Sequence, residues 1–266
     1  MTTGVLIFAY NNEHIDYLAM ANWSAKNIRR HLNLPVAVVT NQVLPDNYYF
    51  EQTIMADTTS QSTRKFADIN ETVTWFNGNR TDAYALTPWQ QTLVLDADYI
   101  VASAQLKTVI EIKKDFVAHQ RAYDVTNHPN FNEHNTFGRN LMPMSWATVM
   151  MFRRSSNAKM IFDLMTMIKN NWNHYRALYG VTRATYRNDY ALSIALNITS
   201  GHTLTSPGIP WSLASVSHEH TLTQVDQDTY RVAYLNQDQK PRYITLKQDF
   251  HAMGKGHLGA IVANSR

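Results

Sequence analysis

Residues Leu93–Val101 have the sequence LVLDADYIV, an apolar run that closes on two aspartates, Asp96 and Asp98. A short apolar run that follows turn residues, here Thr87-Pro88-Trp89, predicts a buried strand. Carboxylates at the end of such a strand must be protonated, paired with a cation or bound to a metal. Because alternate residues of an extended strand point the same way, both aspartates are expected to face one cation. The alternative is a strand-to-loop turn in which they only cap and solvate the chain.

The composition predicts a globular protein. The chain has 266 residues, of which 44% are hydrophobic and 17% charged, enough for one large domain with a substantial core. No apolar run approaches the roughly 18 residues of a membrane helix, and no signal peptide is expected. Cysteine is absent, which excludes disulfides, thiolate zinc sites and cysteine nucleophiles and favours a cytoplasmic location.

The charge balance is mildly basic. The 24 Lys and Arg residues exceed the 21 Asp and Glu residues, for a net charge of +3, and the isoelectric point is about 9.0. Such an excess is compatible with a polyanionic partner without specifying one. Short basic groups, which either form a solvated surface or contact an anion, occur at Arg29-Arg30, Lys113-Lys114, Arg153-Arg154, and Arg183 with Arg187.

The N-terminal part alternates between strand and helix patterns. Val5–Ala9 is a compact apolar run, a helix is expected from near Glu13, and Val36–Thr40 is a β-branched run. This order predicts a parallel strand pair joined by a right-handed crossover. A short strand is expected at Thr53–Ala56, a polar loop with some helix at Asp57–Arg80 and a helical turn at Thr81–Leu86. Two later strands are expected at Asp115–Gln120 and Ser145–Phe152.

The second half combines helices with an antiparallel region. Apolar spacing predicts one helix with Ser156 or Asn157 as N-cap and a buried face that continues through Trp172 and Tyr175. A second helix is expected at Arg187–Ile198. A hairpin is expected from the strands Thr221–Val225 and Tyr230–Leu235, with an additional strand at Tyr243–Leu246. The asparagine-rich segment Ala122–Pro143, which contains His128 and His134, is expected to be mobile. The predicted fold is α/β, with a mainly parallel central sheet flanked by helices and a smaller antiparallel C-terminal part.

The segment Asp249–Leu258, DFHAMGKGHL, contains further groups that can carry chemistry. His251 and Lys255 are four residues apart, and the glycines beside Lys255 allow the backbone to approach a ligand closely. An imidazole beside two carboxylates forms a mixed oxygen and nitrogen site that suits Mn(II) better than Ca(II). A lysine beside such a metal can neutralise a phosphate. The alternative is an ordinary polar C-terminal tail.

These motifs, in this order, resemble those of GT-A-fold glycosyltransferases of the glycogenin and lipopolysaccharide galactosyltransferase type, and of phage-encoded relatives. The resemblance implies a Rossmann-like first half that binds a nucleotide sugar, usually a UDP-sugar. It implies that Asp96 and Asp98 hold manganese (magnesium being the second choice) on the diphosphate and that His251 is a third ligand. It also implies that Phe8, Ala9, Tyr10 and Asn11 seat the uracil and ribose.

Further positions match the family pattern in part. Arg80 matches a basic position on the nucleotide side, and Trp146 and Ala147 match a strand that faces the sugar. Asn188 and Asp189 resemble an Asn-Asp-Gln segment near the reaction centre, although Tyr190 replaces the Gln. The late motif is shortened, because Lys255 follows Gly254 directly and no Lys-Pro-Trp follows it. By this resemblance Lys255 contacts the diphosphate, and Asp189 is either a general base, a stabiliser of an oxocarbenium-like centre or only a helix N-terminal residue.

The predicted function is therefore transfer of a sugar from a UDP-sugar to an acceptor hydroxyl by one domain. Residues 1–120 form its nucleotide-binding half, and residues 121–266 form its acceptor-side half with a C-terminal segment that contacts the metal and the diphosphate. The phage-like resemblance makes a hydroxymethylated base in double-stranded DNA an attractive acceptor, with location in the host cytoplasm, no membrane partner and no predicted oligomeric state. Protein, glycan and lipid-linked acceptors stay open. Two other functions are alternatives: a haloacid-dehalogenase-type phosphatase, and a non-catalytic module that binds nucleotide sugars.

Overall fold

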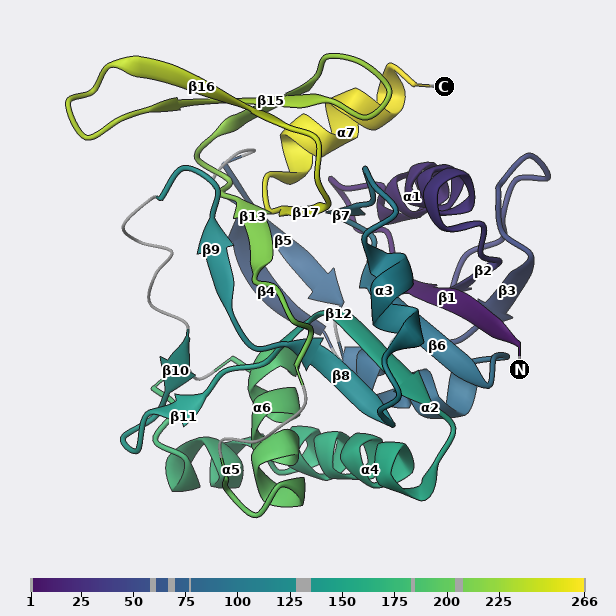
Figure 1. Cartoon of the computed structure of the whole chain (residues 1–266), viewed down its shortest axis with the longest axis vertical. Coiled ribbons are helices and arrows are strands. Elements are labelled where there is room, and N and C mark those ends of the chain that lie inside the picture. Colours follow the sequence, from purple (N-terminus) through teal and green to yellow (C-terminus); the bar gives the residue numbers. More distant parts are fainter. Residues whose placement is uncertain are drawn as a thin grey trace.

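A six-stranded central sheet organises the chain (Figure 1). The computed structural model describes residues 2–57, 61–66, 70–76, 78–127, 135–182, 185–203 and 208–265. The strand order is β3-β2-β1-β6-β12-β8. The bounds of these strands are Thr3–Phe8 for β1, Val36–Thr40 for β2, Gln52–Met55 for β3, Gln91–Asp96 for β6, Phe116–His119 for β8 and Trp146–Arg153 for β12.

The direction of each strand decides where the functional side chains meet. The first four strands of this order are parallel, whereas β12 runs antiparallel to both of its neighbours. The start of β12 at Trp146 therefore lies at the same edge as the ends of β1 and β6, where Phe8 is paired with Asp96. The prediction of an α/β fold with a mainly parallel sheet is confirmed.

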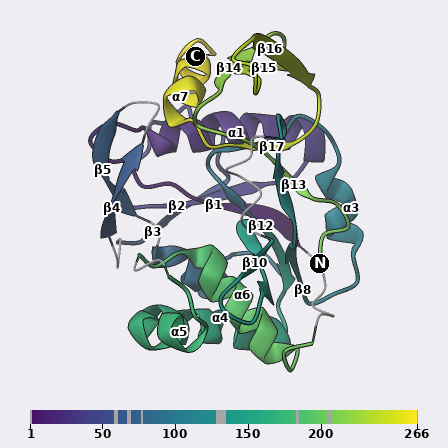
Figure 2. The same cartoon turned by 90° about the vertical axis from the view of Figure 1, so that its left-hand side faces the viewer.

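Helices cover both faces of the sheet (Figure 2). On one side lies α1 (Tyr17–Leu32), against which α7 (Lys255–Ala263) packs. On the other lie α4 (Ser156–Asn170), α5 (Trp172–Leu178) and α6 (Asn188–Thr199). Because both faces are covered, β1, β2 and β6 consist of buried apolar runs, as the sequence indicates. No helix among the described residues is both long and apolar enough to cross a bilayer.

Two helix predictions are wrong at their boundaries. The first helix begins at Tyr17 and not near Glu13, because Asp16 is its N-cap and accepts from the Ala19 N–H at 2.9 Å. The predicted long helix begins after the N-cap Ser155, one residue before Ser156. It ends before Asn171, whose φ of −120° and ψ of 35° separate it from α5. Trp172 therefore belongs to a second, short helix.

The predicted polar loop Asp57–Arg80 contains an antiparallel hairpin, β4 (Gln61–Phe66) and β5 (Glu71–Phe76). The prediction is wrong because β4 (QSTRKF) is almost entirely polar and neither strand contains a continuous apolar run. A short 3₁₀ helix, Gly78–Asp82, and α2, Ala83–Leu86, follow the hairpin, and the helical turn expected before Pro88 is present.

The C-terminal part builds two smaller sheets. The first contains β7 (Tyr99–Ile100), β17 (Phe250–Ala252), β13 (Leu213–Val216) and β9 (Ala122–Asp124) in this order. The second is the antiparallel sheet of β14 (Thr221–Gln224), β15 (Tyr230–Leu235) and β16 (Pro241–Leu246), which confirms the predicted hairpin. With α1 and α7 these strands enclose a second buried cluster that includes Trp23, Tyr230 and Phe250.

Short elements complete the chain. These are α3 (Leu106–Glu111), β10 (Thr136–Phe137) and β11 (Met142–Pro143). The segment that was predicted to be mobile, Ala122–Pro143, thus contributes β9, β10 and β11 where it is described. His128, His134 and Arg183 lie outside the described residues.

Candidate active site and metal centre

The two aspartates are separated by a change of direction at the end of β6. The strand ends at Asp96, and a turn at Ala97-Asp98 leads into β7. The two residues therefore do not share one extended strand. Their side chains converge as expected, but through a turn and not through the alternation of strand residues. The reason is strand pairing, because β17 pairs with β7 and the Ala252 N–H donates to the Asp98 carbonyl at 3.0 Å. The same pairing places His251 opposite Tyr99 and thus next to the aspartates.

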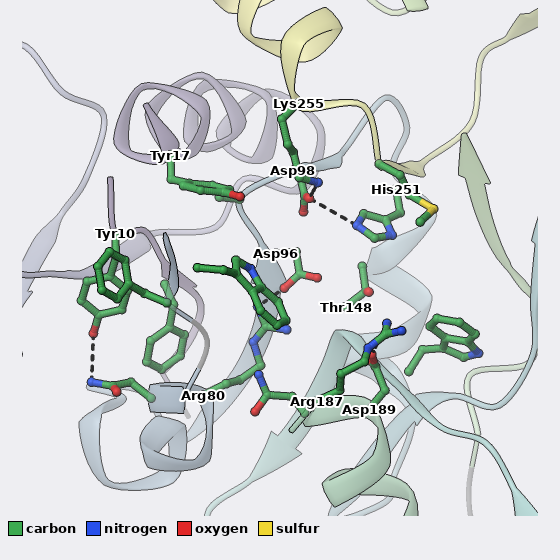
Figure 3. Close-up of a pocket in the computed structure, with 18 residues that line it drawn as sticks. Tyr10, Tyr17, Arg80, Asp96, Asp98, Thr148, Arg187, Asp189, His251 and Lys255 are labelled. Atoms are coloured by element: carbon green, nitrogen blue, oxygen red, sulfur yellow. Dashed lines mark hydrogen bonds and ion pairs between the residues drawn. The ribbon is translucent and has the colours of Figure 1, made fainter. Parts of the chain in front are cut away.

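Asp96, Asp98 and His251 form a compact group of potential metal ligands (Figure 3). Each offers one ligand atom, and these atoms lie within 4.8 Å of one another. His251 Nε2 is 3.3 Å from Asp98 Oδ2. Two carboxylates and one imidazole suit a first-row divalent cation such as Mn²⁺, and carboxylate oxygens also suit Mg²⁺. The donor set and its spacing fit a divalent metal.

Cationic side chains balance the carboxylates. Arg80 forms an ion pair with Asp96, and Lys255 forms one with Asp98. Lys255 is buried and also donates to the Ala252 carbonyl at 3.1 Å. Burying an unpaired carboxylate or ammonium costs several kcal/mol, so these pairs make the cluster compatible with the folded chain. The same two cations lie where a bound polyanion would need counter-charge.

Asp189 is held in place at the other side of the pocket. It lies in the first turn of α6, where Oδ1 accepts from the Ala147 N–H at 2.9 Å and Oδ2 accepts from Arg187 at 2.8 Å. Arg80 donates to the Ala147 carbonyl at 3.2 Å. The Ala147 peptide therefore links the Asp96 side of the pocket to the Asp189 side. Neighbouring Asn188 is buried and accepts from the Tyr186 hydroxyl at 3.0 Å.

Aromatic side chains line part of the same pocket. Tyr10 and Phe76 meet edge to face with ring centroids 6.5 Å apart, and Tyr17 and Trp75 line the same pocket. Burial raises the pKa of Tyr10 to about 12, although a hydrogen bond from Asn79 opposes the shift. The phenol therefore stays neutral, and its oxygen accepts from the Asn79 amide at 3.2 Å. In Figure 3 Tyr10 lies on one side and His251 on the other, with Asp96 and Asp98 between them.

Most residues selected from the sequence line this one pocket. They are Phe8, Tyr10, Arg80, Asp96, Asp98, Trp146, Asn188, Asp189, His251 and Lys255. Ala9 is buried in the core, Ala147 contributes its backbone, and the Asn11 side chain accepts from the Leu18 N–H at 2.8 Å to hold the start of α1.

Sequence reasoning missed several pocket residues. The missed residues are Tyr17, Trp75, Phe76, Asn79, Thr148 and Met253. For Trp75 and Phe76 the sequence signal was an adjacent aromatic pair in a largely polar stretch. The basic pair Arg153-Arg154 lies at the opposite end of β12 from Trp146, where both side chains donate to backbone carbonyls.

The sequence matches no family model and no curated protein. By structure the chain is similar to the apo form of the glycosyltransferase GlyE of Streptococcus pneumoniae TIGR4, with 13% identity and a TM-score of 0.43 over 79% of this chain, and it spans 45% of that chain. It is similar to the galactosyltransferase LgtC in complex with donor and acceptor sugar analogs, with 11% identity and a TM-score of 0.46 over 72% of this chain and 70% of that chain. A third likeness is to mouse xyloside xylosyltransferase 1, with 9% identity and a TM-score of 0.43 over 79% and 84%. With identities and TM-scores this low, the function has to be inferred from the geometry of the pocket.

Proposed function

We propose that this chain is a metal-dependent glycosyltransferase that moves a sugar from a nucleoside diphosphate sugar, a UDP-sugar, to an acceptor hydroxyl. The observation that carries the proposal is one pocket that combines a carboxylate and imidazole metal site, two adjacent cations and an aromatic end. A nucleotide sugar has matching parts in the same order, namely a planar base, a diphosphate and a sugar.

The diphosphate is assigned to the middle of the pocket. Asp96, Asp98 and His251 would hold the divalent metal, for which Mn²⁺ is the first choice and Mg²⁺ the second. Such a metal supplies Lewis-acid stabilisation of the departing diphosphate. Lys255 and Arg80, already paired with the carboxylates, then contribute positive charge beside the phosphates. Residues 1–120 supply most of this donor side.

The sugar is assigned to the side of the pocket that Asp189 and Trp146 line. In the transfer, a bond forms between the acceptor oxygen and the anomeric carbon, and the bond from that carbon to the diphosphate oxygen breaks. The nucleoside diphosphate leaves with the electron pair. Asp189 takes the acceptor proton if the reaction inverts, and stabilises positive charge on the sugar ring if it retains. Its two hydrogen bonds, from Ala147 and Arg187, orient it for either role.

For the acceptor, a hydroxymethylated base in double-stranded DNA is the candidate to test first. The net charge of +3 is compatible with a polyanionic acceptor. An extruded base would present its hydroxyl to the sugar side. A glycan, a protein or a lipid-linked acceptor requires the same donor chemistry, and the residues on the donor side do not distinguish between them.

A thermal-shift screen of nucleotide sugars with Mn²⁺ tests the donor assignment. A donor present at 100 times its Kd stabilises the folded state by about 2.7 kcal/mol, so Tm should rise by several degrees with metal and donor together. His251→Ala should remove most of this shift. His257→Ala is the matched control, since His257 lies on α7 outside the pocket, and it should keep the full shift.

Transfer itself is measured as metal-dependent release of UDP. Asp96→Ala should abolish release, because it removes a ligand and leaves Arg80 without its carboxylate partner. Unchanged release by Asp96→Ala, or a donor-dependent shift that His251→Ala leaves intact, would contradict the proposed site. Binding without release from any donor would instead favour the non-catalytic alternative.

A further inference from the structure

The β4–β5 hairpin forms a two-stranded sheet separate from the central sheet. Its strands pair only with each other among the described residues, from Gln61 opposite Phe76 to Phe66 opposite Glu71. The last two residues of β5, Trp75 and Phe76, nevertheless line the pocket. The hairpin thus adds two aromatic side chains to a site whose other residues come from the sheet edge and the helices.

Two side chains of the loop between β1 and α1 hold the end of β5. The Thr74 carbonyl accepts from the Asn12 amide at 2.9 Å, and the Thr74 N–H donates to Glu13 Oε1 at 3.0 Å. Asn12 is fixed in turn, because its Oδ1 accepts from the His14 and Ile15 N–H groups at 3.0 and 2.8 Å. Backbone N–H groups of Glu13 and Thr74 lower the pKa of Glu13, which keeps it ionised and a strong acceptor at neutral pH.

The hydrogen bonds of Asn12 and Glu13 to Thr74 connect the hairpin to the loop that follows Tyr10. Tyr10 lies two residues before Asn12, and its ring meets that of Phe76 edge to face. Phe76 packs against the main core, whereas Trp75 packs against the second cluster beside α1. The aromatic end is therefore assembled from two chain segments, and the Thr74 peptide is where they are joined.

We propose that the β4–β5 hairpin is the element that holds the nucleobase of the donor. Trp75 and Phe76 form an aromatic seat with Tyr10 for a planar base, and the contacts of Thr74 with Asn12 and Glu13 set the position of that seat. The inference rests on the proposed function, because it assigns the base of the same donor. It adds that base affinity and diphosphate affinity are carried by separate parts of the pocket.

The test compares two probes in the presence of Mn²⁺, UDP and inorganic pyrophosphate, by titration calorimetry. Pyrophosphate engages only the metal and the cations, whereas UDP also engages the hairpin. Because stacking of one base on an aromatic side chain is worth about tenfold or more in affinity, Trp75→Ala should raise the Kd of UDP by about that factor. The Kd of pyrophosphate should stay unchanged.

Substitutions of Glu13 distinguish a role in positioning the hairpin from a general loss of folded structure. Glu13→Ala should raise the Kd of UDP several-fold without affecting pyrophosphate, and Glu13→Gln, which keeps an acceptor oxygen, should restore it. Tyr243→Ala is the control, since Tyr243 is an exposed aromatic residue on a different hairpin, and both probes should bind it as they bind the wild type.

The outcomes also distinguish the inference from the function on which it rests. If the wild type binds UDP and Trp75→Ala and Glu13→Ala bind it equally well, or lose UDP and pyrophosphate in parallel, the role of the hairpin is wrong and the donor site stands. If the wild type binds neither probe, the proposed function fails together with the inference.

Discussion

Asp98 shows how one residue depends on three elements. It lies in the turn after β6, its carbonyl is bound by β17, and its side chain contacts His251 from β17 and Lys255 from α7. A buried carboxylate is tolerated when it is paired and hydrogen-bonded. Here both partners come from residues that follow it by about 150 positions, so the side chain links the end of β6 to the C-terminal segment at the pocket.

His119 offers a test at the same scale that does not involve the metal ligands. The residue is fully buried on β8, where Nδ1 donates to the Trp211 carbonyl at 2.9 Å. Burial lowers the pKa of His119 to about 4, although that hydrogen bond opposes the shift. The folded chain therefore binds this proton only near pH 4, while the unfolded chain binds it near pH 6.5.

Stability should accordingly fall as the pH is lowered from about 6.5 to about 4. A difference of two to three pKa units corresponds to about 3 kcal/mol of unfolding free energy. Urea unfolding of the wild type and of His119→Gln at pH 7 and pH 4 measures it. The wild type should lose about that much more than the variant between the two pH values, and equal losses would contradict the buried neutral imidazole.

At the scale of elements, the loop between β1 and α1 has two tasks. Its Asn11 and Asp16 side chains bond to each other and to the first N–H groups of α1, while Asn12 and Glu13 hold the β4–β5 hairpin. The prediction that Asn11 contacts the nucleotide is therefore not supported by its position. Four polar side chains between positions 11 and 16 thus organise the start of a helix and one wall of the pocket.

The helix cap can be tested by substitution. Asp16→Ala removes the acceptor of the Ala19 N–H and should lower the unfolding free energy by about 1 kcal/mol, with a decrease in Tm of about 2–4 °C. Asp16→Asn, which keeps an oxygen in place, should cost only part of this. Thermal unfolding monitored by circular dichroism provides the measurement, and an unchanged Tm for Asp16→Ala would show that the cap contributes nothing.

At the scale of the whole molecule, the cations at the pocket are balanced by carboxylates. Arg80, Lys255 and Arg187 each pair with a carboxylate there. Arg153 donates to the Ile110 and Ile112 carbonyls at the far end of β12. A DNA acceptor would therefore make few phosphate contacts with these arginines, and its binding should have a shallow salt dependence.

This expectation can be measured with a fluorescent duplex that carries a hydroxymethylated base. Each phosphate contact contributes a slope of about −0.9 to log K against log salt, so a slope that corresponds to only a few contacts is expected between 50 and 200 mM salt. Arg153→Ala should leave the slope unchanged. Absence of binding at low salt would remove DNA as the acceptor and leave the glycan, protein and lipid-linked classes.

Features that depend on neighbouring residues were predictable from the sequence. Buried strands follow from apolar runs such as Val36–Thr40, the antiparallel hairpin from alternation at Tyr230–Leu235, and the ligand types from the chemistry of Asp and His. The convergence of Asp96 and Asp98 with His251 came from a resemblance in motif order. Periodicity does not report which distant segments pair.

Other features were decided only by the tertiary structure. Pairing of β7 with β17 turns the chain between Asp96 and Asp98. The side chains of Asn12 and Glu13 hold a hairpin whose first strand is largely polar and which has no continuous apolar run. The antiparallel direction of β12 moves Arg153 away from the pocket and Trp146 into it. Composition and local pattern thus determined an α/β chain with a cation-binding pair of aspartates. Long-range strand pairing, which depends on the summed packing of many residues, decided what surrounds them.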